Sequence, residues 1–407
     1  MHRTGWRHRL TGAVDGAGRA LHVIPRRRRA ALVAAAAALL LAPQLTTASA
    51  TETSWTRIGG LHTGRDFAVS VLDRIGRVLV AGGLANGEVL DSAEVFDPWR
   101  GAWTPTGRMT TGRYAASATT LADGRVLVAG GVRYGGHLAT AELYDPATNR
   151  WQPTGSMLAP RALHTATLLS DHRVLVAGGF NGSDALATAE LYDPARGEWT
   201  LALPMLAPRF VHTATVLGDG RVLVAGGFAA GYQAELPVTP RAPVAGAYTR
   251  GPSAELCDPR LGSWSPTPNM FWLRGGHTAT RLGDGRVLVA GGYDVDRGRP
   301  LDIAEVYDPT TDTWKLTGRM NQARGFHTAT RLDDGGVLVS GGGAMDLSGC
   351  TASAERYTPA GGAWTAVPPM SSARCRHVAQ PLPGGGAVVA GGTDGRVAVR
   401  AAEVFRP

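Results

Sequence analysis

Short apolar runs recur along this chain, each between a turn-forming pair and two glycines. Residues 219–227 read Asp-Gly-Arg-Val-Leu-Val-Ala-Gly-Gly, and close copies occupy residues 123–131 and 284–292. An Asp-Gly pair favours the positive φ angles of a two-residue hairpin turn. Four apolar residues of β character suffice for a buried strand, and a diglycine ends a strand where a Cβ would crowd a neighbouring backbone. The pattern therefore predicts repeated short β-hairpins.

Three landmarks recur seven times each in the same order, and they define the repeat. The diglycines begin at Gly82, Gly130, Gly178, Gly226, Gly291, Gly341 and Gly391. Ala-Glu pairs follow, with their acids at Glu94, Glu142, Glu190, Glu255, Glu305, Glu355 and Glu403. The tryptophans are Trp55, Trp103, Trp151, Trp199, Trp264, Trp314 and Trp364. Successive diglycines lie 48, 48, 48, 65, 50 and 50 residues apart, a period that indicates a repeat architecture such as a β-propeller.

Each repeat is predicted to contribute four strands, and the two chain ends predict how the ring closes. The apolar run is the second strand, the Ala-Glu segment the third and the Trp segment the fourth. Residues 55–58 form a Trp strand that precedes the first diglycine, whereas residues 402–405 end the chain on a third strand. Adding the first to the last completes the seventh blade and removes an exposed gap. We predict one all-β domain, residues 51–407, with seven blades closed by an N-terminal strand.

The repeat resembles the kelch repeat in its order of diglycine, aromatic-Asp-Pro and Trp. The phrase Arg-x-x-His-Thr-Ala-Thr over residues 209–215, followed by residues 219–227, is similar to the seven-bladed catalytic domain of galactose oxidase and its relatives. The resemblance covers residues 55–407. It implies a kelch propeller and raises the question of copper-radical chemistry.

Residues 1–50 have the pattern of an export signal. Four arginines at positions 26–29 precede an apolar stretch over residues 30–42, and Ala48-Ser49-Ala50 fits a signal peptidase site. The alternative is an uncleaved anchor, and both the Sec and the twin-arginine routes stay open. The whole chain has a formal charge of +8, and the eight arginines and one aspartate of residues 1–50 leave +1 for residues 51–407. We therefore expect a secreted monomer with no nucleic-acid partner and no stable membrane span after cleavage.

The copper ligands implied by the resemblance are tested position by position. The family supplies a Tyr-His pair from a first strand, and the corresponding positions here read Leu163-His164, Val211-His212, Gly276-His277, Phe326-His327 and Arg376-His377. Phe326 has no oxygen for copper, and the position of the radical tyrosine holds Phe67 or Ala115, with Tyr114 one place early. Copper is therefore not expected. The alternative is a copper site with His327 as a ligand. A His or Glu present in most blades is better explained by hydrogen bonding inside the ring, with the Glu accepting between blades.

Binding residues are expected on the face that carries the longer, varied loops, because variable loops on a rigid scaffold commonly bind ligands. An arginine opens each first strand there, and the rim candidates are Arg161, Arg209, Arg274, Arg324 and Arg374. The alternative is that these arginines pair with acids of the blades. Tyr232 and Tyr248 lie in an insertion of the fourth repeat, and Trp272, Asp294 and Asp296 lie in the next repeat. Aromatic rings beside carboxylates suit a sugar or a peptide, whereas two aspartates alone are weak evidence for calcium.

Three cysteines complete the candidate chemistry. Cys350 and Cys375 fall on the varied face of adjacent blades, and export permits oxidation, so we predict a disulfide between them. Cys257 replaces a third-strand Tyr and is expected to be a buried thiol.

Two classes of function are compatible with these sequence features. The first is a secreted binding module for an extracellular protein or glycan, favoured because no catalytic constellation is recognisable. The alternative is a galactose-oxidase-like or other carbohydrate-acting enzyme. A fold by itself does not choose between them.

Overall fold

The computed structural model describes residues 53–229 and 253–407. Over these ranges the secondary structure is β-strand without helix, and seven four-stranded antiparallel sheets follow one another along the chain. No helix long and apolar enough to cross a membrane occurs in the described residues. The predicted export signal over residues 1–50 lies outside them.

The four strands of each blade are named here from the centre outward. The innermost strands are β2 (Val69–Leu72), β8 (Ser117–Thr120), β14 (Thr165–Leu168), β18 (Thr213–Val216), β23 (Thr278–Arg281), β28 (Thr328–Arg331) and β32 (Val378–Pro381). The second strands are β3 (Val78–Ala81), β9 (Val126–Ala129), β15 (Val174–Ala177), β19 (Val222–Ala225), β24 (Val287–Ala290), β29 (Val337–Ser340) and β33 (Ala387–Ala390). The third strands are β6 (Ala93–Asp97), β12 (Ala141–Asp145), β16 (Ala189–Asp193), β20 (Ala254–Asp258), β26 (Ala304–Asp308), β30 (Ala354–Thr358) and β34 (Ala402–Arg406). The outermost strands are β7 (Ala102–Pro105), β13 (Arg150–Thr154), β17 (Glu198–Ala202), β21 (Ser263–Pro266), β27 (Thr313–Leu316), β31 (Ala363–Val367) and β1 (Ser54–Ile58).

Three shorter pairs of strands accompany the blades. Two are hairpins in the loops between second and third strands, and the third pairs the segment before a first strand with such a loop. They are β4 (Leu84–Ala85) with β5 (Glu88–Val89), β10 (Val132–Arg133) with β11 (Gly136–His137), and β22 (Arg274–Gly275) with β25 (Tyr293–Asp294).

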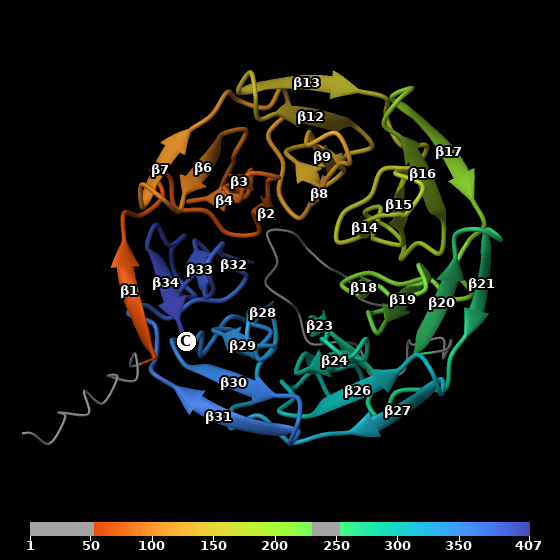
Figure 1. Ribbon diagram of the computed structural model, residues 1–407. Helices are drawn as coiled ribbons and strands as arrows, with labels where there is room; N and C mark the ends of the chain where they lie inside the picture. The colour runs from red at the N-terminus through yellow and green to blue at the C-terminus, as the bar shows by residue number, and fades with distance from the viewer. Residues whose placement is uncertain (1–52, 230–252) are drawn as a thin grey trace, which may run out of the picture. The chain divides into compact units, whose positions relative to one another are not determined.

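The seven sheets form a closed ring around a central axis (Figure 1). Each innermost strand contacts the innermost strand of the next blade, and β32 of the last blade contacts β2 of the first. The outermost strands lie on the circumference (Figure 1). The predicted all-β, seven-bladed propeller is therefore confirmed.

The first and last segments of the described chain meet in the seventh blade. Strand β1 pairs antiparallel with β34, with Ser54 opposite Arg406 and Ile58 opposite Ala402. Figure 1 shows this junction as the red strand beside the dark blue one. The indole nitrogen of Trp55 also donates to the carbonyl oxygen of Pro368 at 2.8 Å. This blade thus holds strands from both ends of the propeller.

The hydrophobic core lies between adjacent blades. The Val-Leu-Val-Ala strands are buried at every position because a neighbouring sheet covers each of their faces. Leu127 of the second blade, for example, packs in one cluster with Val176 and Tyr192 of the third. The Trp199 and Tyr192 rings pack against each other in a tilted arrangement, with ring centroids 4.9 Å apart. The indole nitrogen of Trp199 donates to the carbonyl oxygen of Gly155 in the preceding blade at 2.7 Å. The regular spacing of these aromatics therefore fastens blade to blade.

Gly291→Ala should destabilise the protein far more than Gly262→Ala, although both glycines have nearly the same φ, 62° and 63°. A left-handed conformation costs an L-residue about 1–2 kcal/mol at either site. A Cβ at Gly262 would meet no atom within 4 Å, whereas at Gly291 it would lie 2.5 Å from the Arg324 carbonyl oxygen and 2.7 Å from the His327 ring. Overpacking of that kind adds about 1–3 kcal/mol. Urea denaturation of both variants measures the difference, and equal losses would contradict the role assigned to the diglycine.

Candidate functional site

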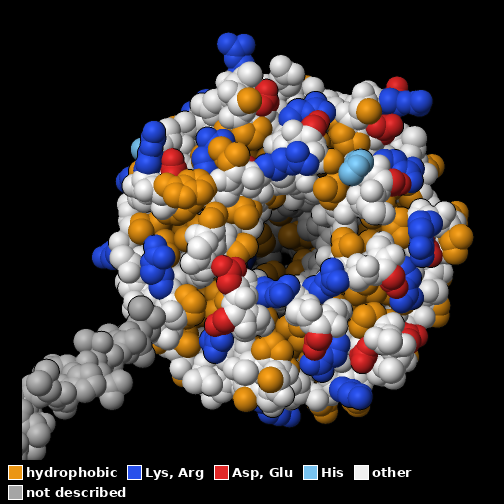
Figure 2. Space-filling view, in the orientation of Figure 1, with side chains coloured by type: hydrophobic (Ala, Val, Ile, Leu, Met, Phe, Trp, Pro, Cys, Tyr) orange, Lys and Arg blue, Asp and Glu red, His pale blue; other side chains and the backbone are white. Residues whose placement is uncertain are grey.

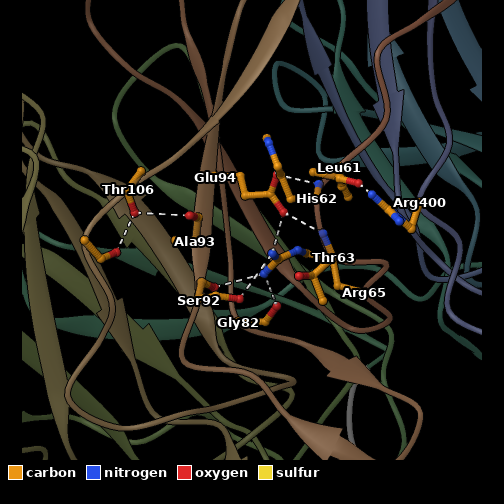
Figure 3. Close-up of polar contacts among 11 residues, drawn as sticks. Leu61, His62, Thr63, Arg65, Gly82, Ser92, Ala93, Glu94, Thr106 and Arg400 are labelled. Carbon is orange, nitrogen blue, oxygen red and sulfur yellow. Dashed lines mark hydrogen bonds and ion pairs between the residues drawn. The ribbon is translucent and has the colours of Figure 1, made fainter.

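A buried ion pair organises the loop-bearing end of each blade, and the first blade shows its geometry (Figure 3). Arg65 precedes β2 and Glu94 lies on β6, and their Nη2 and Oε1 atoms are 2.8 Å apart. Arg65 also donates to the carbonyl oxygens of Gly82 and Ser92, both at 2.9 Å. Glu94 accepts from the backbone nitrogen of His62 at 2.8 Å. The pair therefore joins the diglycine, the start of the third strand and the segment that arrives from the preceding blade.

The same pair recurs in all seven blades, with Nη2 to Oε1 distances of 2.5–2.8 Å. The pairs are Arg65–Glu94, Arg113–Glu142, Arg161–Glu190, Arg209–Glu255, Arg274–Glu305, Arg324–Glu355 and Arg374–Glu403. We call them the arginine–glutamate clamps. The five arginines considered as rim ligands are 0–4% exposed, so their guanidinium groups face blade acids and backbone carbonyls instead of solvent. Each glutamate bonds the arginine of its own blade and, as expected of an acceptor between blades, also accepts from the backbone of the segment that arrives from the preceding blade.

Of the other residues expected to bind ligand, Trp272 and the two aspartates lie on neighbouring segments of the fifth blade, because Arg274 pairs with Asp294 across β22 and β25. Tyr232 and Tyr248 lie outside the described residues. The carboxylate of Asp294 is buried and accepts from the backbone nitrogens of Asp296 and Arg297 at 3.0 and 3.1 Å. Asp296 is exposed, and the backbone nitrogen of Trp272 donates to Glu305 of a clamp at 3.2 Å. Asp294 thus stabilises its own turn.

Cys350 and Cys375 form a disulfide, with Cα atoms 5.4 Å apart. It links the second-to-third loop of the sixth blade to the start of the seventh blade's first strand. Cys257 is a buried free thiol, and burial raises its pKa to about 11.

A chain of backbone hydrogen bonds encircles the central axis at the entrance to the innermost strands. One residue from each blade takes part, two positions after the clamp arginine, and all seven have φ between 50° and 66°. They are Phe67, Ala115, Leu163, Val211, Gly276, Phe326 and Arg376. Each backbone nitrogen from Ala115 onward donates to the carbonyl oxygen of the preceding member at 2.9–3.2 Å. We call this set the axial ring.

The axial ring is interrupted between the seventh and the first blade. There the backbone nitrogen of Phe67 donates to Oδ1 of Asp66 at 2.9 Å. The other carboxylate oxygen, Oδ2, lies 2.7 Å from Nη2 of Arg376. The Arg376 guanidinium also stands 4.2 Å from the centroid of the Phe67 ring. Burial raises the pKa of Asp66 to about 6 despite the opposing effect of Arg376.

A cavity of about 270 Å³ follows the axis at this level. Its lining combines axial-ring residues with the histidines next to them, namely Phe67, Ala115, Leu163, Val211, Phe326, Arg376, His164, His212, His327 and His377, together with Ala68 and Ala116. Figure 2 shows the hollow at the centre of the ring, with apolar side chains in its walls. In this otherwise apolar and histidine-lined cavity, Arg376 supplies a guanidinium.

Five histidines fasten the innermost strands to each other. Each Nε2 lies 2.8–3.0 Å from a hydroxyl of the preceding blade, in the pairs His164–Ser117, His212–Thr165, His277–Thr213, His327–Thr278 and His377–Thr328. Burial lowers the pKa of His164 and that of His327 to about 3. It lowers the pKa values of the other three well below the ordinary range. These five side chains, which we call the histidine belt, are therefore neutral bridges between blades.

The residues present do not fit the copper centre of a radical oxidase. His327, the alternative ligand, already bonds Thr278 through Nε2, and its neighbour Phe326 offers no oxygen donor. Tyr114 lines a cleft between two hairpins, away from the axial cavity. In residues 53–229 and 253–407, no group of three His, Cys, Asp or Glu side chains could hold a metal ion.

Sequence reasoning did not select Asp66, and it considered Arg376 only as a copper position. A signal for both exists in the repeat. The two positions after the clamp arginine hold uncharged residues in the second to sixth blades, whereas Asp66 and Arg376 are charged. Their proximity follows only from closure of the ring.

Comparison with known proteins agrees with this architecture. A family model described as Kelch motif matches residues 76–110, 113–158, 161–206 and 274–321. Among solved structures, the chain is similar to a "novel fungal alcohol oxidase with catalytic diversity among the AA5 family, in complex with copper". The TM-score is 0.68 at 17% identity, over 87% of this chain and 76% of that chain, which shows a shared fold alone. No curated protein matches the sequence.

Proposed function

Because this chain is a kelch-repeat β-propeller whose fold resembles the galactose oxidase propeller, we propose that it is a secreted binding module. Its ligand is an extracellular protein or glycan, and the axial cavity with Asp66 and Arg376 is the anchoring site. The propeller supplies a rigid frame, and the cavity supplies the place where the seven-fold repeat is broken.

The Asp66–Arg376 pair is the observation that carries this proposal. A site for one ligand must differ from its symmetry-related positions, and this pair occurs at one of the seven positions. The Arg376 side chain is 6% exposed, and its Nε has no hydrogen-bond partner in the described residues. The Arg376 guanidinium lines the cavity. A ligand carbonyl, hydroxyl or carboxylate oxygen would accept from this guanidinium, while Phe67 and Phe326 contact apolar parts of the ligand.

Two further observations support an extracytoplasmic location. Residues 1–50 have the charge and apolar pattern of an export signal. The Cys350–Cys375 disulfide is of the kind that persists in oxidising compartments.

Arrays of glycans and of extracellular proteins test the binding role, with purified protein lacking the export signal. The Asp66→Asn/Arg376→Gln variant keeps an oxygen acceptor for Phe67 but removes both charges. We expect this variant to bind the captured ligand at least tenfold more weakly, a loss of about 1.4 kcal/mol in binding free energy. The matched control, Asp171→Asn/Arg173→Gln, neutralises an exposed pair in a hairpin of the third blade and should bind normally. No captured ligand, or equal loss in both variants, would contradict the proposal.

Copper loading tests the enzymatic alternative separately. Elemental analysis and an optical spectrum should show no stoichiometric copper, because the donor set around His327 lacks the tyrosine oxygens of a radical site. Stoichiometric copper that is lost in His327→Gln would instead support an oxidase.

A further inference from the structure

A second cavity lies between the first two blades, apart from the axis. It occupies about 350 Å³ between the β4–β5 hairpin and the β10–β11 hairpin. Leu84, Val89 and Val132 form apolar walls, and Tyr114 belongs to the same buried cluster. We call this cavity the hairpin cleft.

Tyrosines stand at the base and at the lip of the hairpin cleft. Tyr114 is 4% exposed, whereas Tyr134, at the turn of the β10–β11 hairpin, is 69% exposed. The Tyr134 hydroxyl donates to the carbonyl oxygen of Gly87 at the turn of the opposite hairpin. The Tyr134 side chain therefore bridges the two hairpins while its ring stays largely open to solvent.

An imidazole also lines the cleft. His137 lines the cleft, and its buried Nε2 has no hydrogen-bond partner in the parts of the chain that the structure describes. Its ring packs edge-on to Phe180 at 5.6 Å between centroids. At the same turn, a Cβ on Gly135 or Gly136 would meet no atom within 4 Å. The backbone there is open to close approach by a ligand.

We propose that the hairpin cleft binds a neutral pyranose residue, such as the terminal sugar of a glycan. The volume lies at the lower end of the range for small-molecule sites, which are mainly apolar and aromatic with a few polar groups. A tyrosine offers an apolar face and a hydroxyl that both donates and accepts, which matches a sugar ring with its apolar face and hydroxyls. Of the residues lining the cleft, Arg133 carries a charge, and it is exposed.

This proposal rests on the binding function and deepens it by naming a ligand class, at a cleft whose lining residues differ from those of the axial cavity. Asp66→Asn/Arg376→Gln should therefore leave sugar binding in the hairpin cleft unchanged. Loss of array binding in that variant and loss of sugar binding in a cleft variant would report on separate sites.

Saturation-transfer NMR with methyl glycosides of glucose, galactose, mannose and N-acetylglucosamine tests the cleft, with glucuronic acid as the charged comparison. We expect transfer to at least one neutral glycoside. Tyr134→Ala should weaken binding of that glycoside about tenfold. Tyr134→Phe, which keeps the ring, should weaken binding less than about threefold. Trp99→Ala is the control, because Trp99 is a similarly exposed aromatic (66%) in the β6–β7 turn.

Three results would overturn the proposal. They are no transfer to any neutral glycoside, binding of glucuronic acid alone, and Tyr134→Ala binding that equals that of the wild type. Since Tyr134 is exposed, its replacement should leave the fold intact, and the thermal unfolding midpoint checks this.

Discussion

Arg161→Met is expected to lower the free energy of unfolding by about 3–5 kcal/mol, the usual cost of removing one partner of a buried ion pair. Arg161 and Glu190 are fully buried, with Nη2 and Oε1 2.6 Å apart. The substitution also removes donors to the carbonyl oxygens of Gly178 and Thr188, at 2.8 and 3.0 Å. Glu190 would remain as a buried charge without its cation. Urea denaturation near neutral pH measures the loss.

The matched control is Arg173→Met, which breaks a partly exposed pair with Asp171 in a hairpin of the same blade. Exposed pairs contribute about 0–1 kcal/mol, so a loss as large as that of Arg161→Met would contradict the assignment. The double variant Arg161→Met/Glu190→Leu distinguishes a clamp from a simple ion pair. We expect no recovery of stability, because the backbone groups that both side chains bond would stay unpaired.

Acidification from about pH 7.5 to about pH 5 should destabilise the propeller through the histidine belt, by about 4 kcal/mol from His164 and His327 together and further from the other three. All five histidines have lowered pKa values in the folded state, about 3 for His164 and His327. The unfolded chain takes up their protons below about pH 6.5, whereas the folded chain stays neutral. Their stabilising effect is therefore complete above pH 6.5 and declines as the pH falls toward the folded values. His164 and His327 each contribute about 2 kcal/mol of the change at pH 5, and the other three histidines act in the same direction.

Asp66 has the opposite effect on stability as the pH falls, and its effect is smaller. Its pKa is raised to about 6, so the folded state gains up to about 1.4 kcal/mol between pH 6 and 5. Urea unfolding at several pH values gives the net slope. His164→Gln should reduce that slope by about one proton, and His172→Gln, at an exposed hairpin residue, is the matched control. A stability independent of pH between 6.5 and 5 would show that the belt does not stay neutral.

The clamps and the belt are repeated, and this is why neither marks a binding site. A side chain present in most blades stabilises each repeat against its neighbours, and its seven clamp copies or five belt copies are spread around the axis. The positions that break the repeat, such as Asp66 and Arg376, are better candidates for recognition of a single ligand.

The seven blades could be predicted from sequence because the information is local. A turn pair, four apolar residues, a diglycine and a Trp each act within one repeat of about 50 residues, and counting them gives the number of blades. The Trp segment over residues 55–58 likewise predicts a strand for the last blade, and β1 pairs with β34.

The burial and the partners of the polar side chains depended on tertiary structure. From sequence, seven arginines at strand entrances suit a ligand rim as well as they suit blade acids, and only packing shows that they are buried against glutamates. Asp66 and Arg376 lie near opposite ends of the chain, and closure of the ring brings their charged atoms within 2.7 Å. The sequence by itself therefore determined the repeat and the number of blades, whose causes are short-range. Only the closed propeller decided which charges are buried, which pair across the seam and which aromatics border a cavity, because those contacts join residues far apart along the chain.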